Sequence, residues 1–169
     1  MRPELLLLRL VHILCGTFWV GSGVYSGIFL TPAITSSGVN AGQLFAALGK
    51  RRLFAVLPLI ALLTIASGFR LLWITSGGSL GEYAGSLAGR TYLFSGAAAV
   101  LAFVLSLGVS RPMAVRTGQL TAALRSESAD RDAIGRQLAT LRRRLSVSSA
   151  TALALLVLCA AGMSVGRYL

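Results

Sequence analysis

Hydrophobic residues in this chain are gathered into four long blocks separated by more polar segments. The blocks cover Leu5–Leu30, Leu53–Ile74, Thr91–Val109 and Val147–Val165. About 20 apolar residues in helical conformation cross the hydrocarbon core of a bilayer, and each block reaches or approaches that length. The pattern predicts an all-α fold, a bundle of four transmembrane helices that forms one integral membrane domain over residues 1–169.

The segment between the third and fourth blocks, residues 111–145, mixes leucines and arginines at helical spacing. Apolar residues three or four positions apart share one face of a helix, so the segment predicts two amphipathic helices. Pro112 suits the first turn of the first helix, and Ser128 or Asp130 can cap the second. We expect the second helix to run directly into the fourth span, as part of a basic, cytoplasmic helical loop.

The other connections are shorter or rich in glycine. The first span is expected to end at Thr31-Pro32, because proline cannot extend the hydrogen-bond ladder of a helix. A short interfacial helix is expected over Gln43–Arg52, and Pro58 falls about one turn into the second span, a tolerated position. The outer connection SGGSLGEYAGSLAG is predicted to be a loop, and no internal repeat is evident.

The net charge of +11 is concentrated in two of the three connections between the blocks. Membrane proteins keep the more basic of their short loops in the cytoplasm. The charge pattern therefore predicts that these two connections face the cytoplasm and that both termini lie outside it. The basic residues concerned are Lys50, Arg51 and Arg52 in the first connection and Arg111, Arg116, Arg125, Arg131, Arg136, Arg142, Arg143 and Arg144 in the third.

Several classes of function are disfavoured by the residue types present. No aromatic residues alternate with the arginines of residues 111–145, so a base-stacking nucleic-acid surface is not expected. These arginines either lie against the anionic head groups of the lipid bilayer or form a solvated extension of the bundle. Cys15 and Cys159 fall within separate spans, so they predict no disulfide framework. The spans hold no deep carboxylate for proton-coupled transport and no catalytic triad around the single histidine.

The first span carries a stripe of small and ring-bearing residues. A helical projection places these residues on one face: His12, Gly16, Trp19, Gly23, Ser26 and Gly27. Glycines flatten that face and allow a close approach to the backbone, either by another helix or by a flat cofactor. Gly23 and Gly27 form the small-xxx-small pair that is typical of contacts between transmembrane helices.

His12 requires a partner, because an imidazole in hydrocarbon loses its hydration. One solution is a hydrogen bond to a backbone carbonyl or a serine of a neighbouring span. The other is axial ligation of haem iron. In that case Arg70 and Arg90 could hold the haem propionates and Met163 could supply a sixth ligand. Arg70 could equally extend towards lipid head groups, and Met163 could simply fill space in the core.

The stretch LRLVHILCGTFWVGSGVYSGIFLTP resembles the first helix of the CopD-like and HemJ-like group of small bacterial membrane proteins. The match lies at His12, Trp19 and Gly21, with further echoes in ASGFRLLW and GMSVGRYL. A HemJ-like relationship implies a haem-binding bundle that acts in protoporphyrinogen oxidation and uses a first-helix histidine. At the start of the third span this chain has Arg90 where those proteins have lysine, and Ser22 interrupts the glycine pair.

The CopD-like resemblance implies copper handling, for which one histidine and three methionines make a poor path. The sequence thus favours a small, non-catalytic accessory or scaffold subunit of the bacterial inner membrane. Its glycine-lined first helix is expected to pack against a protein partner or a second copy of the chain. The alternative is a b-type haem protein with His12 as the axial ligand.

Overall fold

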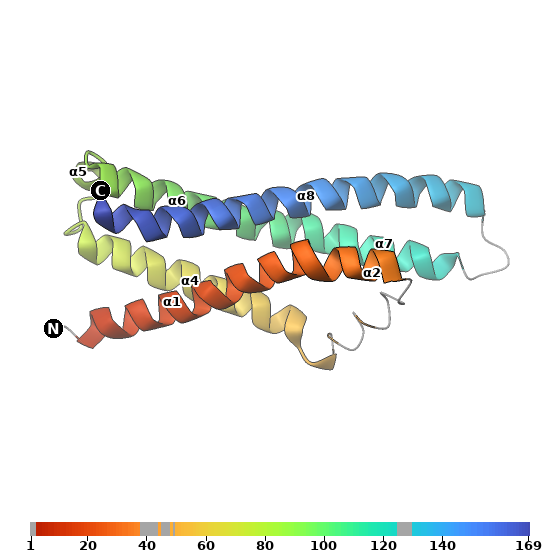
Figure 1. The fold of residues 1–169 in the computed structure, drawn as a ribbon, viewed down its shortest axis with the longest axis horizontal. Coiled ribbons are helices and arrows are strands. Elements are labelled where there is room, and N and C mark those ends of the chain that lie inside the picture. The colour runs from red at the N-terminus through yellow and green to blue at the C-terminus, as the bar shows by residue number, and fades with distance from the viewer. Residues whose placement is uncertain (1–2, 38–43, 45–47, 49, 125–129) are drawn as a thin grey trace.

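A computed structural model of the chain describes residues 3–37, 44, 48, 50–124 and 130–169. Every regular element in these ranges is helical, and four helices are long and apolar enough to cross a membrane. The prediction of an all-α, four-span bundle is therefore confirmed (Figure 1). Most of the interfacial helix expected over Gln43–Arg52 lies outside the described residues.

The first span extends further than predicted. Helix α1 (Pro3–Val24) continues as a π-helix, η1 (Tyr25–Leu30), and then as α2 (Thr31–Ser37). The expected end at Thr31-Pro32 was wrong, because the backbone N–H of Thr31 donates to the carbonyl of Ser26, five residues earlier. This wider turn accommodates the proline ring where a regular α-turn would press it against the carbonyl four residues back.

The second span is helix α4 (Leu53–Thr75), which contains Pro58 near its start, as expected. The connection that follows is tighter than the predicted loop, because it contains one short helix, α5 (Leu80–Tyr83). Gly77 and Gly78 have φ values of 63° and 85°, a left-handed conformation that glycine adopts without steric cost. These two residues turn the chain out of α4 and into α5.

The third and fourth spans are longer than a bilayer requires. Helix α6 (Leu87–Val104) continues as a second π-helix, η2 (Leu105–Ser110), and as α7 (Arg111–Ala123). Helix α8 (Arg131–Val165) is followed by a 3₁₀ turn, η3 (Gly166–Tyr168). The carboxylate of Asp130 accepts a hydrogen bond from Ala133 N–H at 3.0 Å, so the predicted cap and the continuous run into the fourth span are confirmed.

The helices are arranged as two antiparallel hairpins. The first hairpin consists of α1, η1, α2 and α4, and the second consists of α6, η2, α7 and α8. Within each hairpin the two long helices pack closely together, and fewer contacts join one hairpin to the other. Both chain ends and α5 lie at one end of the bundle, the terminal end; α7 and the start of α8 extend from the opposite, basic end (Figure 1).

The two hairpins form a structural repeat that the sequence analysis missed. In their first helices, positions 80 residues apart match, including the two six-residue π-helices. Each π-helix is followed by a proline at the second position of the next helix, Pro32 or Pro112. The repeat was hard to recognise because identical residues are few; among the matched pairs are Gly16 with Gly96 and Ser26 with Ser106.

The core lies in the middle of the bundle, where the two hairpins meet. Trp19 of α1 packs edge to face against Phe103 of α6, with ring centroids 6.3 Å apart. Around this pair the helices meet through small residues, including the fully buried Ala61 and Ala102. Small side chains allow close approach of the helices, which supplies dispersion contacts in a membrane where water drives no association.

Candidate functional site

His12 is held on its own hairpin partner. Its Nδ1 lies 2.8 Å from the backbone carbonyl of Thr64 on α4, so Nδ1 carries the proton and donates this bond. The hydroxyl of Ser67 lies 3.4 Å from the same nitrogen and donates to the carbonyls of Leu63 and Thr64 at 2.6 and 3.1 Å. This is the backbone-carbonyl solution foreseen for an intramembrane histidine. It ties α1 to α4 at the level of His12.

The Cε1 edge of the His12 imidazole lies against the backbone of α4 at Gly68. A methyl group built on Gly68 would lie 2.6 Å from Cε1 and 3.0 Å from Nδ1 of His12, so only glycine leaves room for the ring. The donation from Nδ1 leaves Nε2 with a lone pair. Nε2 has no hydrogen-bond partner among the described residues. Every fully buried side-chain nitrogen or oxygen of the described residues does have a partner, so Nε2 is not fully buried. Nε2 is therefore accessible.

The predicted glycine stripe is used inside the bundle. Gly16 faces the methyl group of Thr64 on α4, whereas Gly23 and Gly27 face Leu156 and Leu153 of α8. The close approach that the stripe allows is made by the chain's own helices, α4 and α8. Gly21 falls off the stripe, and a methyl group built on it would have no described atom within 4 Å.

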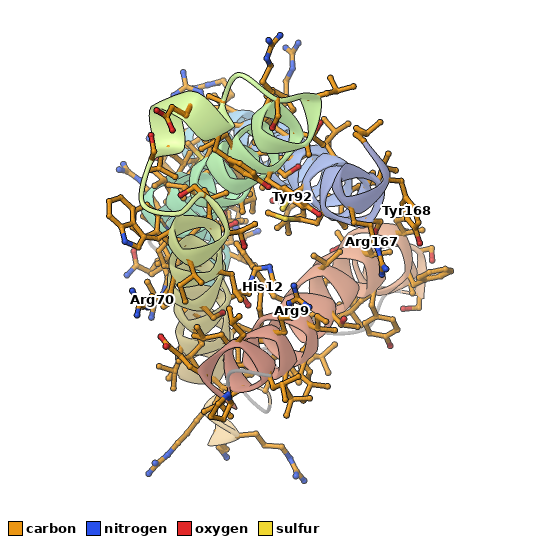
Figure 2. All side chains as sticks on the ribbon, turned by 90° about the vertical axis from the view of Figure 1, so that its left-hand side faces the viewer. Arg9, His12, Arg70, Tyr92, Arg167 and Tyr168 are labelled. Atoms are coloured by element: carbon orange, nitrogen blue, oxygen red, sulfur yellow. The ribbon has the colours of Figure 1, made fainter. Side chains whose placement is uncertain are left out.

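Arg70 does not join His12. Its Nε and Nη2 donate to one carboxylate oxygen of Glu4 at 3.1 and 2.8 Å, which forms an ion pair between the two helices of the first hairpin. Viewed from the terminal end, Arg70 lies on the outer flank of α4, away from the space between the hairpins (Figure 2). The pair is exposed to solvent or head groups, so it stabilises the fold only weakly.

Arg90 and Met163 are also not among the residues that contact the His12 imidazole. Arg90 donates to the carbonyls of Ala84 and Gly85 at 3.0 and 3.3 Å, so it secures the turn between α5 and α6. Met163 is half-buried on α8 and has no polar contact among the described residues. Of the predicted site residues, Gly16 and Trp19 therefore remain near His12 on α1, while both arginines bind elsewhere.

Two polar residues at the terminal end escaped the sequence analysis. Arg9 lies three residues before His12, on the same face of α1, and makes no hydrogen bond or ion pair with the described residues (Figure 2). Tyr92 is the counterpart of His12 in the second hairpin, and its ring packs against Gly166. The spacing of three would have identified Arg9, and the 80-residue offset would have identified Tyr92.

Tyr92 also influences a neighbouring phenol outside the spans. Partial burial, together with Tyr92, raises the pKa of Tyr83 above its ordinary value of 10.0. Tyr83 therefore stays neutral at physiological pH. Among the described residues, no group of three histidine, cysteine, aspartate or glutamate side chains could hold a metal ion. The terminal end thus offers the Nε2 of His12, the guanidinium of Arg9 and the phenols of Tyr83 and Tyr92.

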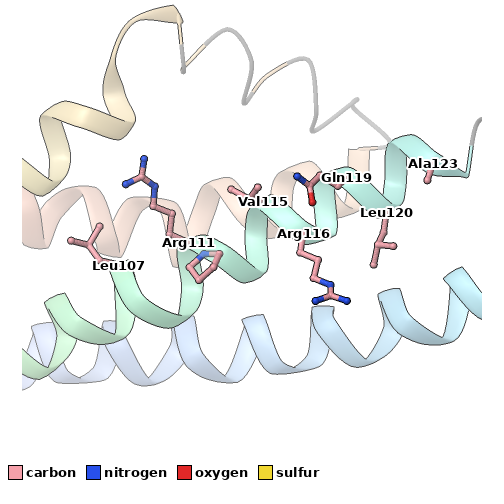
Figure 3. A pocket seen from close by; sticks show the side chains of 8 residues that line it. Leu107, Arg111, Val115, Arg116, Gln119, Leu120 and Ala123 are labelled. Atoms are coloured by element: carbon pink, nitrogen blue, oxygen red, sulfur yellow. The ribbon is translucent and has the colours of Figure 1, made fainter.

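At the basic end, α7 borders two surface clefts. The larger, of about 750 Å³, runs along α7 and combines apolar with basic side chains (Figure 3). The smaller, of about 420 Å³, lies between α7 and α8. The side chain of Arg116 belongs to both clefts and extends from α7 towards α8 (Figure 3). The larger cleft is lined by Leu107, Arg111, Pro112, Val115, Arg116, Gln119, Leu120 and Ala123.

Comparisons of this chain with protein-family models, curated proteins and solved structures give no match. The resemblance to CopD-like and HemJ-like proteins therefore stays a prediction from the motif around His12.

Proposed function

We propose that this chain is a non-catalytic integral membrane subunit that presents a basic helical extension to a protein partner. The basic extension consists of α7 and residues 131–147 of α8. The observation that supports it is length: the third and fourth helices run for 37 and 38 residues, whereas about 20 cross a bilayer. The residues in excess pack against each other as two antiparallel helices: Leu138 is buried, and the hydrogen bond of 2.9 Å between Ser110 and Ser148 lies at the base of the extension.

The polar side chains at the terminal end bind other parts of the same chain, which supports a structural role for the protein. His12 ties α1 to α4, Arg70 is paired with Glu4, and Arg90 secures the turn before α6. Each of these groups joins one part of the chain to another, and they do not converge on a common point. The partner-binding surface proposed here is therefore the extension, rather than the glycine stripe that the chain's own helices occupy.

The basic end is proposed to face the cytoplasm of a bacterial cell, because its arginines obey the positive-inside tendency. A reporter that is active only outside the cytoplasm, inserted between α7 and α8, is then expected to be silent. The same reporter fused after Leu169 is expected to be active. The reverse pattern would overturn the orientation.

Photo-crosslinking in intact cells tests the partner. A photoreactive residue at Val115, exposed on α7, is expected to form an adduct with another protein, or a dimer if the partner is a second copy. Leu7, exposed on α1 and expected to face lipid, is the matched control position and should give none. Equal adducts at both positions, or none at Val115 in a correctly inserted chain, would contradict the proposal.

A second function, b-type haem binding, is favoured by one observation. A histidine whose Nδ1 donates to a carbonyl is oriented in the way that metal-ligating histidines are, with Nε2 available to the metal. Haem is the cofactor that the HemJ-like resemblance implies. In this arrangement Arg9, three residues from His12, replaces Arg70 and Arg90 as the cation proposed for a propionate.

An absorption spectrum of the purified protein separates the two functions. The non-catalytic subunit is expected to be colourless. A haem protein would show a Soret band that is lost in His12→Ala, weakened in Arg9→Gln and unchanged in Arg70→Lys. A band that survives in His12→Ala would exclude His12 as the ligand, and a colourless protein purified from haem-supplemented cells would remove the second function.

A further inference from the structure

The smaller cleft at the basic end carries charge of one sign only. It is lined by Arg116 from α7 and by Arg136, Gln137, Thr140, Leu141 and Arg144 from α8. No described carboxylate lines it, and none of its three arginines forms a salt bridge with a described residue. Three guanidinium groups that share a cleft repel one another, so a bound anion would stabilise the arrangement.

The depth of this cleft can be estimated from the antiparallel register of the second hairpin. The hydroxyls of Ser110 and Ser148 are hydrogen-bonded at 2.9 Å, so these two residues mark one level on both helices. The roughly 20 residues from Ser148 to Tyr168 rise about 30 Å, which is the thickness of the hydrocarbon core. The Ser110–Ser148 level therefore lies near the edge of the hydrocarbon.

Two of the three arginines then have backbone positions within or just beyond the head-group layer. Arg144 is about 6 Å beyond the Ser110–Ser148 level and Arg116 about 9 Å, at 1.5 Å of rise per residue. The polar head-group layer is roughly 5–8 Å thick on each side of a bilayer. Arg136, about 18 Å beyond that level, closes the side of the cleft remote from the membrane. A ligand delivered from the membrane would meet Arg144 and Arg116 first.

We propose that Arg116 and Arg144 bind the phosphate of an anionic phospholipid head group in the adjacent leaflet, with Arg136 at the outer side of the same cleft. Each guanidinium offers planar, paired donors that match phosphate oxygens. The hydroxyl of Thr140, which donates to the carbonyl of Arg136 at 3.1 Å, and the amide of Gln137 supply polar groups for the rest of the head group. The site lies on the basic extension, and lipid binding there requires neither a bound partner nor haem.

The test measures binding of phosphatidylglycerol to the full chain in neutral detergent by native mass spectrometry. Arg116→Gln/Arg144→Gln is compared with Arg142→Gln/Arg143→Gln, which removes the same charge from exposed positions of α8 outside the cleft. The cleft variant is expected to lower the affinity about tenfold more than the control variant does, because it removes two directed donors. Equal losses would show a diffuse charge effect and overturn the site.

Two further arms identify the source of the phosphate. Phosphatidylcholine, whose head group has no net charge, is expected to bind at least about tenfold more weakly than phosphatidylglycerol. Inorganic phosphate at millimolar concentration should not displace the lipid; displacement would assign the cleft to a soluble anion and overturn the lipid proposal. If the cleft variant does not fold, Arg116→Lys is compared with Arg143→Lys. Lysine lacks the paired donors of the guanidinium, so lipid affinity is expected to fall only in Arg116→Lys.

Discussion

Each hairpin packs an aromatic ring of its first helix against a glycine, at positions 80 residues apart in the chain, but the two hairpins hold the ring differently. In the first hairpin His12 lies on Gly68 and donates to the Thr64 carbonyl. In the second hairpin Tyr92 lies on Gly166, and its hydroxyl forms no hydrogen bond with a described residue. The shared packing shows that the glycine serves helix approach in both hairpins. The hydrogen-bonded imidazole is the addition that distinguishes the first hairpin.

The hairpins also differ at the opposite end. The second hairpin continues into the basic extension of α7 and α8, whereas α4 of the first hairpin begins at Leu53. Polar chemistry is therefore divided between the repeats: a histidine near the terminal end of the first, and an arginine cleft at the basic end of the second. A pair of packed helices can thus carry either a hydrogen-bonded histidine or an arginine cleft.

The largest expected effect is that of Gly68→Ala. The new methyl group would collide with a ring that cannot move without losing its bond to Thr64. We expect a loss of about 2–4 kcal/mol of unfolding free energy, from overpacking and the broken hydrogen bond. Denaturation in mixed micelles measures it. Adding His12→Ala should recover part of the loss; strictly additive effects would contradict a collision between these two residues.

Gly23→Val tests the contact between the hairpins. Leu156 of α8 lies 3.2 Å from a methyl group built on Gly23, and valine adds two further carbons. We expect a loss of about 1–3 kcal/mol and a lower melting temperature in detergent. Gly21→Val, at a position with no described atom within 4 Å, is the matched control and should change stability little. Equal melting temperatures for the two variants would show that Gly23 does not pack against Leu156.

Gly166→Ala should have a smaller effect than Gly68→Ala and so sharpens the comparison. The added methyl group would lie 2.9 Å from Cε1 of Tyr92, but this ring has no hydrogen bond to a described residue that would anchor it, and it can shift. We expect a loss of about 1 kcal/mol in the same denaturation assay. A loss as large as that of Gly68→Ala would show that the imidazole's hydrogen bond does not distinguish the hairpins.

Arg70→Lys should have the smallest effect. Arg70 and Glu4 have side-chain exposures of 52% and 53%, and exposed ion pairs contribute little to stability. We expect a change below about 0.5 kcal/mol in detergent at moderate salt, and a similarly small change for Glu4→Gln. A loss above about 1 kcal/mol in either variant would show that this pair is a main link within the first hairpin.

The sequence was sufficient for the spans, since blocks of about 20 apolar residues have few alternatives to a membrane helix. The cap at Asp130 followed from local chemistry, because a carboxylate before a helix accepts from its first free N–H groups. The continuation through Pro32 did not follow, because a π-turn depends on the packing around it as much as on the residues in it.

The candidate site was less predictable than the fold. The stripe on α1 identified residues that face other helices, but a helical projection gives no identity to the neighbour. The pairing of Arg70 with Glu4 joins residues far apart in the chain, and their proximity depends on the register of α1 against α4. The same holds for His12 and Gly68, where a glycine in the second span makes room for the imidazole.

The short helix α5 is the link between the two hairpins, and its position bears on how the protein is made. Each hairpin joins helices that are adjacent in the chain, and most close packing occurs within a hairpin. During synthesis the first pair can therefore insert and pack before the second has left the ribosome. The second pair then docks laterally, as a preformed unit, onto a surface already in place. The bundle would then assemble from two helical hairpins that insert in turn and are joined by the single helical turn of α5.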